Sequence, residues 1–323
     1  MLPSMFEAPN LRHLQLSDLT FLSPSTQLLN KNATAYLPIV TFSLEKIPTD
    51  LATLMSCLAS MPHLKVLKIG SSSFSRPSKQ TRRGKLKFLA GSQPNSAFLA
   101  LKDLEEFEYQ GTSNYLEALA ARISAPLLKK LTVSVFNTVS RANLDTSFEH
   151  FSRLISGAAD LAFQFARVRF RDGFSIVMDH DELWTGRGAF ELIFAADASY
   201  DEVAPVASML APMPSTVQSL LLEDGDRDYY ESESDREGWR ELLRVFDKVK
   251  TLCVAGRLVK ELEESLKPDE KGSAVQTLSP ELQEIVRYGP ELEFADFVRA
   301  RQDAGVGSPV CVVSGPKNRL TLF

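Results

Sequence analysis

A short apolar phrase that follows a proline recurs along this chain and constrains its fold more than any other feature. In the clearest copies, at residues 8–16, 61–69 and 125–133, a leucine lies two residues after the proline, and apolar residues follow that leucine at three and five positions. Less regular copies occupy residues 213–222 and 279–287. The last two apolar residues of each phrase share one face of a strand because side chains alternate along a strand. The recurrence predicts a stack of similar units.

The pattern Leu-x-x-Leu-x-Leu is typical of leucine-rich repeats. We take the middle apolar residue of each strand phrase as its anchor, and successive anchors are 24 to 40 residues apart. These intervals suit an irregular repeat of a strand plus a helix. The anchors are Leu14, Val40, Leu67, Phe107, Leu131, Leu220, Leu252 and Ile285, with the weaker Val168 and Leu192 between the fifth and the sixth.

Helical patterns fill several of the intervals between anchors. Apolar residues spaced three and four apart predict one buried helix face in each of the segments 51–58, 116–123, 148–155, 203–210 and 239–246. Prolines follow the helical patterns and precede the strands, a junction that suits a residue without an N–H. We therefore predict an α/β leucine-rich-repeat solenoid, with successive parallel strands in a curved sheet, helices on the outer face and a single domain over residues 1–323.

Three segments interrupt the repeat and are predicted to be flexible insertions. They lie near residues 70–96, which are basic, 224–237, which are mostly acidic, and 267–273. Each could be a contact site or only a solvated loop, and a solvated loop is the simpler interpretation. Separately, Phe174 to Met178 and Ala189 to Ala195 alternate apolar residues as additional strands would.

Composition narrows the classes of partner. The formal net charge of −5 disfavours a general nucleic-acid binder. No apolar run approaches the roughly 18 residues that span a bilayer. The three cysteines have no metal-binding or redox spacing, which indicates reduced thiols in the cytoplasm or nucleus. We expect a protein partner, with neither nucleic acid nor membrane.

The sequence indicates no catalytic chemistry. The four histidines are scattered and form no metal-ligand spacing with a cysteine. The run from Asp179 to Glu182 contains acids and a histidine, but a solvated turn explains it better than a metal or acid–base site. We therefore expect no enzyme, cofactor, catalytic residue or metal site.

The residues between the apolar positions of each strand phrase should face away from the core. They form either a solvated sheet surface or a polar surface for binding a protein. Three arginines of one strand phrase alternate and could bind an acidic or phosphorylated segment, or could pair with Glu191 or Asp172 instead. The candidate partner-binding residues are His13, Gln15, Thr41, Lys68, Glu106, Glu108, Lys130, Thr132, Arg167, Arg169, Arg171, Ser219, Glu223, Thr251 and Glu284.

A distinctive set of runs occupies residues 104–111, 115–119, 121–128, 166–170, 297–305 and 309–312. It includes a helical pattern, an Ala-Pro-Leu-Leu hinge and a strand in the middle of the chain, and a helix and a strand near its end. Together these runs resemble the middle section and the end of the F-box and leucine-rich-repeat-like proteins of basidiomycete fungi, and the likeness extends over most of the chain.

The resemblance implies the substrate-recognition subunit of an SCF ubiquitin ligase. An F-box would dock on a Skp-type adaptor, and the repeats would hold the target. This sequence contains no F-box, although residues 37–42 begin in a similar way. We expect an upstream segment to cover the first strand of the solenoid, because an uncapped end exposes a strand edge. The alternative is a stand-alone scaffold or ligand-binding repeat protein with no ubiquitin link.

Overall fold

The fold was analysed in a computed structural model of the whole chain. The structure describes residues 10–17, 38–45, 51–70, 98–136, 148–158, 163–170, 173–180, 189–195, 200–210, 213–224, 236–256, 258–266, 280–288, 294–303, 305 and 309–315. The strands are β1 His13–Ser17, β2 Thr41–Glu45, β3 Val66–Gly70, β4 Leu99–Ala100, β5 Glu106–Gly111, β6 Ile123–Ser124, β7 Lys130–Val135, β8 Phe165–Phe170, β9 Gly173–Asp179, β10 Phe190–Ala195, β11 Ser219–Asp224, β12 Thr251–Ala255, β13 Glu284–Tyr288 and β14 Cys311–Ser314. The helices are α1 Leu51–Ala59, α2 Ser113–Ala120, α4 Glu149–Ser156, α5 Tyr200–Met209, the 3-10 turn η3 Met213–Thr216, α6 Arg236–Val245, α7 Leu258–Leu266 and α8 Ala295–Asp303.

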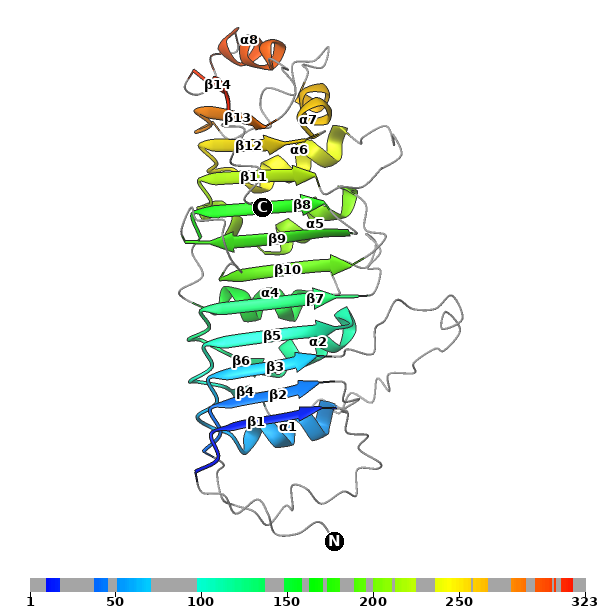
Figure 1. Cartoon of the computed structure of the whole chain (residues 1–323), viewed down its shortest axis with the longest axis vertical. Helices are drawn as coiled ribbons and strands as arrows, with labels where there is room; N and C mark the ends of the chain where they lie inside the picture. Colours follow the sequence, from blue (N-terminus) through cyan, green and yellow to red (C-terminus); the bar gives the residue numbers. More distant parts are fainter. Residues whose placement is uncertain are drawn as a thin grey trace, which may run out of the picture.

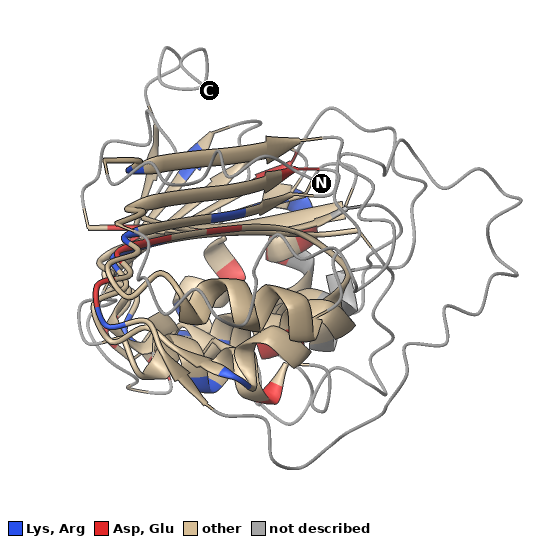
Figure 2. Ribbon diagram, turned by 90° about the horizontal axis from the view of Figure 1, so that it is seen from below, with Lys and Arg blue, Asp and Glu red and all other residues tan. Residues whose placement is uncertain are grey.

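One twelve-stranded sheet forms the body of the molecule, in the order β1-β2-β3-β5-β7-β10-β9-β8-β11-β12-β13-β14 (Figure 1). Strands β4 and β6 pair separately as a short parallel ladder. Seen along its length, the sheet forms one layer and the helices form a second layer against one of its faces (Figure 2). This arrangement confirms the predicted α/β leucine-rich-repeat solenoid with a long, mostly parallel sheet.

The core lies between these two layers and is aligned from strand to strand. One cross-strand row carries most of the predicted anchors on the face that packs against the helices. Three predicted anchors lie two residues away from this row. The row contains Phe42 instead of Val40, Ala166 instead of Val168 and Phe190 instead of Leu192. The row consists of Leu14, Phe42, Leu67, Phe107, Leu131, Phe190, Met178, Ala166, Leu220, Leu252, Ile285 and Val312.

The helix layer follows the predicted amphipathic faces. Helices α1, α2, α4, α5 and α6 form where the periodicity predicts them, and each buries apolar residues of its pattern. Helix α2 ends before Ile123, which lies in β6 instead. Helix α7 was not predicted from the sequence, although Leu258, Val259 and Leu262 give it a buried face.

The expectation that all neighbouring strands are parallel is wrong in the middle of the sheet. Strand β9 runs antiparallel to both β8 and β10. The connections explain this, because only residues 171–172 separate β8 from β9, whereas a parallel crossover needs a dozen residues or more. Strand β10 is parallel to β7 and β8 is parallel to β11, so the direction of the solenoid continues on both sides of the reversal.

The predicted insertions fall mostly outside the described residues, namely 71–97, 225–235 and 267–279. The structure describes only their borders, where β3 ends at Gly70, β11 ends at Asp224 and α6 begins at Arg236. The sheet extends from β1 to β14, and the single-domain boundaries of 1–323 stay a prediction. No helix in the described part of the chain is long and apolar enough to cross a membrane.

Candidate protein-binding face

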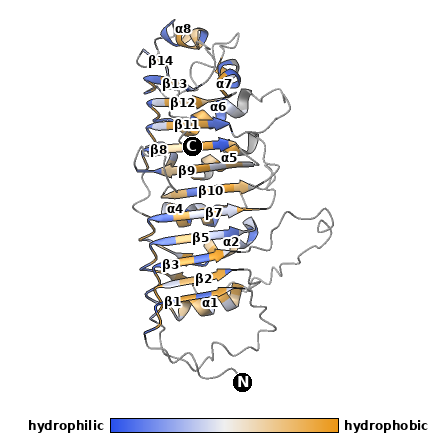
Figure 3. Cartoon of the chain, viewed as in Figure 1, coloured by the Kyte–Doolittle hydropathy of each residue, from blue (hydrophilic) through white to orange (hydrophobic). Residues whose placement is uncertain are grey.

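The sheet face opposite the described helices, here called the helix-free face, is built by the residues that alternate with the core row. Figure 3 shows the resulting mixture of hydrophilic and hydrophobic residues along the strands of the sheet. Three cross-strand rows share this face, beginning at His13, Gln15 and Ser17 of β1. The strand register fixes which residues of distant repeats become neighbours. The middle row consists of Gln15, Ser43, Lys68, Glu108, Thr132, Glu191, Val177, Arg167, Leu221, Cys253, Val286 and Val313.

Fourteen of the fifteen candidate residues lie on the helix-free face, and Arg171 falls outside the described residues. The alternation rule places them correctly because each phrase forms a regular strand in register with its neighbours. Their role in binding stays a prediction. His13, Thr41, Glu106, Lys130, Ser219, Thr251 and Glu284 lie in the first row, Gln15, Lys68, Glu108, Thr132 and Arg167 in the middle row, and Arg169 and Glu223 in the third.

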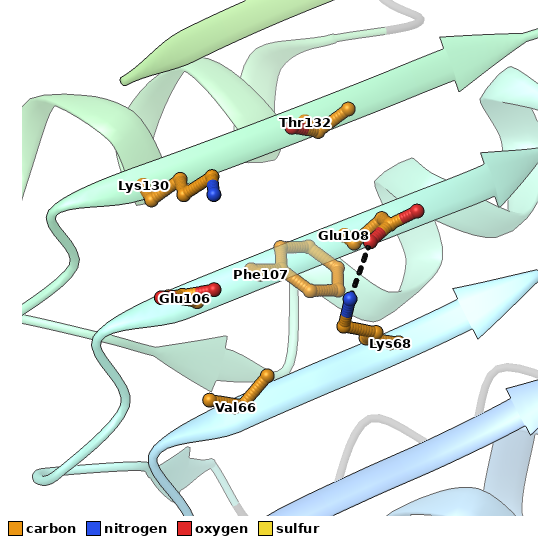
Figure 4. A pocket seen from close by; sticks show the side chains of 7 residues that line it. All are labelled: Val66, Lys68, Glu106, Phe107, Glu108, Lys130 and Thr132. Carbon is orange, nitrogen blue, oxygen red and sulfur yellow. Dashed lines mark ion pairs between the residues drawn. The ribbon is translucent and has the colours of Figure 1, made fainter. Parts of the chain in front are cut away.

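On β3, β5 and β7, the charged residues of the helix-free face lie beside residues of opposite charge. Lys68 Nζ lies 3.0 Å from a carboxylate oxygen of Glu108 on the next strand (Figure 4). Glu106 and Lys130 lie opposite each other in register. Together with Val66, these four residues line a shallow depression across β3, β5 and β7. Because its charges face opposite charges, this half offers little unmatched charge to a partner.

A second set of charges lies along the edge where the strands begin. Lys65, Glu105 and Lys129 each directly precede a strand, and the Glu105 carboxylate lies 3.1 Å from Lys65 Nζ and 3.2 Å from Lys129 Nζ. The backbone N–H groups of residues 105 and 106 both donate to the Lys65 carbonyl. Hydrogen bonds from Lys65 and Lys129, reinforced by their charges, lower the pKa of the Glu105 carboxyl below its ordinary value.

This arrangement predicts a pH-dependent contribution from Glu105. A carboxyl whose pKa is lower in the folded state stabilises the fold above its unfolded pKa of about 4.3, and the contribution is lost as the pH falls through the folded pKa. The Glu105→Gln variant should therefore melt slightly below the wild type at pH 7, and the difference should shrink below about pH 4. Thermal melts from pH 3 to pH 7 measure it, and a constant difference would contradict the assignment. Glu281→Gln, in a looser edge pair with Lys248, is the matched control.

Two arginines of β8, Arg167 and Arg169, lie in the middle of the helix-free face and differ in their hydrogen bonding. Arg169 Nε donates to a carboxylate oxygen of Glu223 at 2.9 Å, and Glu223 is only 6% exposed. Arg167 has a buried Nε with no hydrogen-bond partner among the residues that the structure describes. Burial lowers the pKa of Arg167 and so does Arg169, whereas Glu223 and Glu191 raise it. The alternative of internal pairing thus holds for Arg169, with Glu223 as its partner.

Apolar side chains continue the middle row in the carboxyl-terminal half of the face. Leu221, Cys253, Val286 and Val313 lie on four adjacent strands, opposite the core side. These residues were not predicted as part of the binding surface, because only polar residues of this face were taken as candidates. A signal was present, since Leu220-Leu221-Leu222 and Leu252-Cys253-Val254 are continuous apolar runs, which indicate a strand with two apolar faces.

The histidine and cysteine side chains that could act as nucleophiles, acids or bases include members that are hydrogen-bonded within the fold or buried. His150 Nδ1 lies 2.7 Å from Glu117, and the same carboxylate accepts the backbone N–H groups of His150 and Phe151 at the start of α4. His180 lies at the end of β9, where its N–H donates to Asp179. Burial raises the pKa of the Cys57 thiol to about 11, which leaves it unreactive at neutral pH. Among the described residues, no group of three His, Cys, Asp or Glu side chains could hold a metal ion.

The chain was compared with family models, with curated proteins and with solved structures. No family model matches the chain, and no curated protein matches it. Among solved structures, the leucine-rich repeat-containing protein LegL7 from Legionella pneumophila is similar over 82% of this chain and 73% of that chain, with 16% sequence identity and a TM-score of 0.31. The assignment of the solenoid fold to this chain therefore depends on its own repeat phrases, strand order and register.

Proposed function

We propose that this chain is a non-enzymatic protein-recognition module whose helix-free face is the binding surface. The supporting observation is the row of partly exposed apolar side chains at Cys253, Val286 and Val313 on a face that no described helix covers. Parallel sheets normally have both faces covered, and apolar surface rimmed by polar residues is typical of a site for a partner.

The finer proposal is that this module is the substrate-binding part of an F-box-type SCF ubiquitin ligase receptor of the cytoplasm or nucleus. Its support is the sequence resemblance at the hinge and at the carboxyl-terminal segments. Docking on a Skp-type adaptor is proposed only for a protein that also carries an F-box, which this sequence lacks. The alternative is a stand-alone leucine-rich-repeat scaffold without a ubiquitin link.

Site-specific crosslinking in native cells tests the recognition role. A photoreactive residue at position 286, on the helix-free face, should crosslink to discrete proteins, whereas the same residue at the exposed position 260 of α7 should not. Equal crosslinking at both positions, or none at position 286, would contradict the proposed role. Purification of the natural full-length protein separates the two finer readings, because a Skp-type adaptor should accompany a ligase receptor and should be missing from a scaffold.

A further inference from the structure

We propose that the carboxyl-terminal half of the helix-free face binds an extended segment of a partner protein that carries apolar side chains and ends in a carboxylate held by Arg167. This inference rests on the recognition role proposed above and adds the chemical class of the partner. The residues that would make the contact are Arg167, Cys253, Val286 and Val313 of the middle row, whereas Leu221, between Arg167 and Cys253, is only 4% exposed and would lie beneath the segment.

The shape of the apolar row favours an extended segment. Adjacent strands lie about 4.8 Å apart, so Cys253, Val286 and Val313 on β12, β13 and β14 span about 10 Å, which suits two side chains from one side of an extended chain. Polar residues border this row on the side where the strands begin, at Thr251 of β12 and Glu284 of β13. A partner helix would present an apolar stripe more than 100° wide and would cover these polar neighbours as well. A single line of side chains matches this bordered row better.

Arg167 supplies the charge complementarity at one end of the row. It lies directly opposite Leu221, and its buried Nε has no hydrogen-bond partner among the described residues. The neighbouring Arg169 is already held by Glu223. A carboxylate from a partner could accept two parallel N–H bonds from the Arg167 guanidinium, which are among the stronger hydrogen bonds in proteins.

The surrounding charges favour a carboxylate over a phosphate. Glu223 and Glu191 both lie close enough to act electrostatically on Arg167. They would repel a phosphate, with its charge near −2, more strongly than a singly charged carboxylate. In the amino-terminal half, by contrast, Lys68 is already paired with Glu108. The described residues thus place a guanidinium whose Nε has no hydrogen-bond partner among them beside the apolar row.

Binding of defined synthetic peptides tests this partner class. The probes are nine-residue fluorescent peptides with blocked termini that alternate leucine with serine and carry glutamate, glutamine, lysine or phosphoserine at one end. In fluorescence anisotropy, the glutamate peptide should bind about tenfold more tightly than the glutamine and lysine peptides. Tighter binding of the phosphoserine peptide would overturn the choice of a carboxylate, and equal binding of all four would overturn the role of charge.

Two variants assign the preference to Arg167. Arg167→Met removes the charge but keeps an apolar stem, and it should bind the glutamate and glutamine peptides equally. Arg167→Glu should favour the lysine peptide. Arg153→Glu makes the same charge change on an exposed residue of α4 and should leave the preference unchanged. A glutamate preference that survives in both Arg167 variants would place the carboxylate elsewhere.

Chemical modification of the Cys253 thiol shows independently where the peptide binds. In a Cys311→Ser background, the glutamate peptide should slow the modification of Cys253 by a maleimide at least several-fold, because the peptide would cover the middle row. Tight binding without this protection would overturn the location. Peptides that fail to bind while position 286 still crosslinks to cellular proteins would contradict the partner class alone, whereas failure of both experiments would contradict the recognition role as well.

Discussion

Replacing Phe194 with alanine should lower the free energy of unfolding by about 3–5 kcal/mol. Phe194 of β10 is 5% exposed, stacks on Phe174 of β9 at 4.9 Å between ring centroids and meets the edge of Phe148 beside α4 at 5.8 Å. The truncation would therefore leave a cavity where the reversed strand packs on the helix layer, and the rigid rings around it could collapse only in part.

Guanidinium denaturation followed by circular dichroism measures this loss. Phe98→Ala is the matched control because Phe98 is 65% exposed, and its free energy of unfolding should stay within about 0.5 kcal/mol of the wild type. A similar loss in both variants would contradict the central packing role of the Phe194 ring. A loss in Phe194→Ala of less than about 1 kcal/mol would contradict it as well.

The second large effect is expected at Glu117. Its carboxylate, on α2, accepts the backbone N–H groups of His150 at 2.6 Å and Phe151 at 3.0 Å and therefore caps the start of α4 from a neighbouring repeat. The residue at the N-cap position, Phe148, provides no side-chain hydrogen bond. Glu117→Ala should lower the free energy of unfolding by about 2–3 kcal/mol, because it leaves two N–H groups and the positive end of a helix without an acceptor.

Two comparison variants separate the cap from general charge effects. Glu149→Ala removes an exposed acid at the same helix end, which pairs with Arg153 within α4, and it should cost less than about 1 kcal/mol. Glu117→Gln keeps an acceptor oxygen and should give an intermediate loss. Hydrogen exchange of the α4 amides should be fastest in Glu117→Ala, and unchanged exchange there would rule out the capping role.

The two halves of the helix-free face differ in what they could contribute to recognition. Charges such as Lys68 and Glu108 in the amino-terminal half lie in contact, so a partner would have to break an existing pair to gain a new one. Apolar residues such as Val286 in the carboxyl-terminal half need no such exchange. We therefore expect binding energy to concentrate near Arg167 and Val286, with the charged half contributing mainly to selectivity.

The sequence by itself determined the repeat and most of the faces. The spacing of Leu64, Leu67 and Ile69 requires a strand with one apolar face, and the helix-period residues between phrases require a covering layer. Local periodicity also identified the polar candidates, because a residue such as Glu106 must point away from Phe107 in any regular strand. These inferences need only the geometry of single elements.

Only the tertiary structure decided which residues of different repeats meet. The reversal at β9 places Val177 between Glu191 and Arg167, an order that no local pattern specifies. The cap that Glu117 gives to α4 and the pairing of Arg169 with Glu223 likewise join residues more than 30 positions apart. Among the described residues, the neighbouring Arg167 Nε has no hydrogen-bond partner. Such contacts depend on strand order and register, which are set by the packing of the whole stack, whereas periodicity reports only the surroundings of one element at a time.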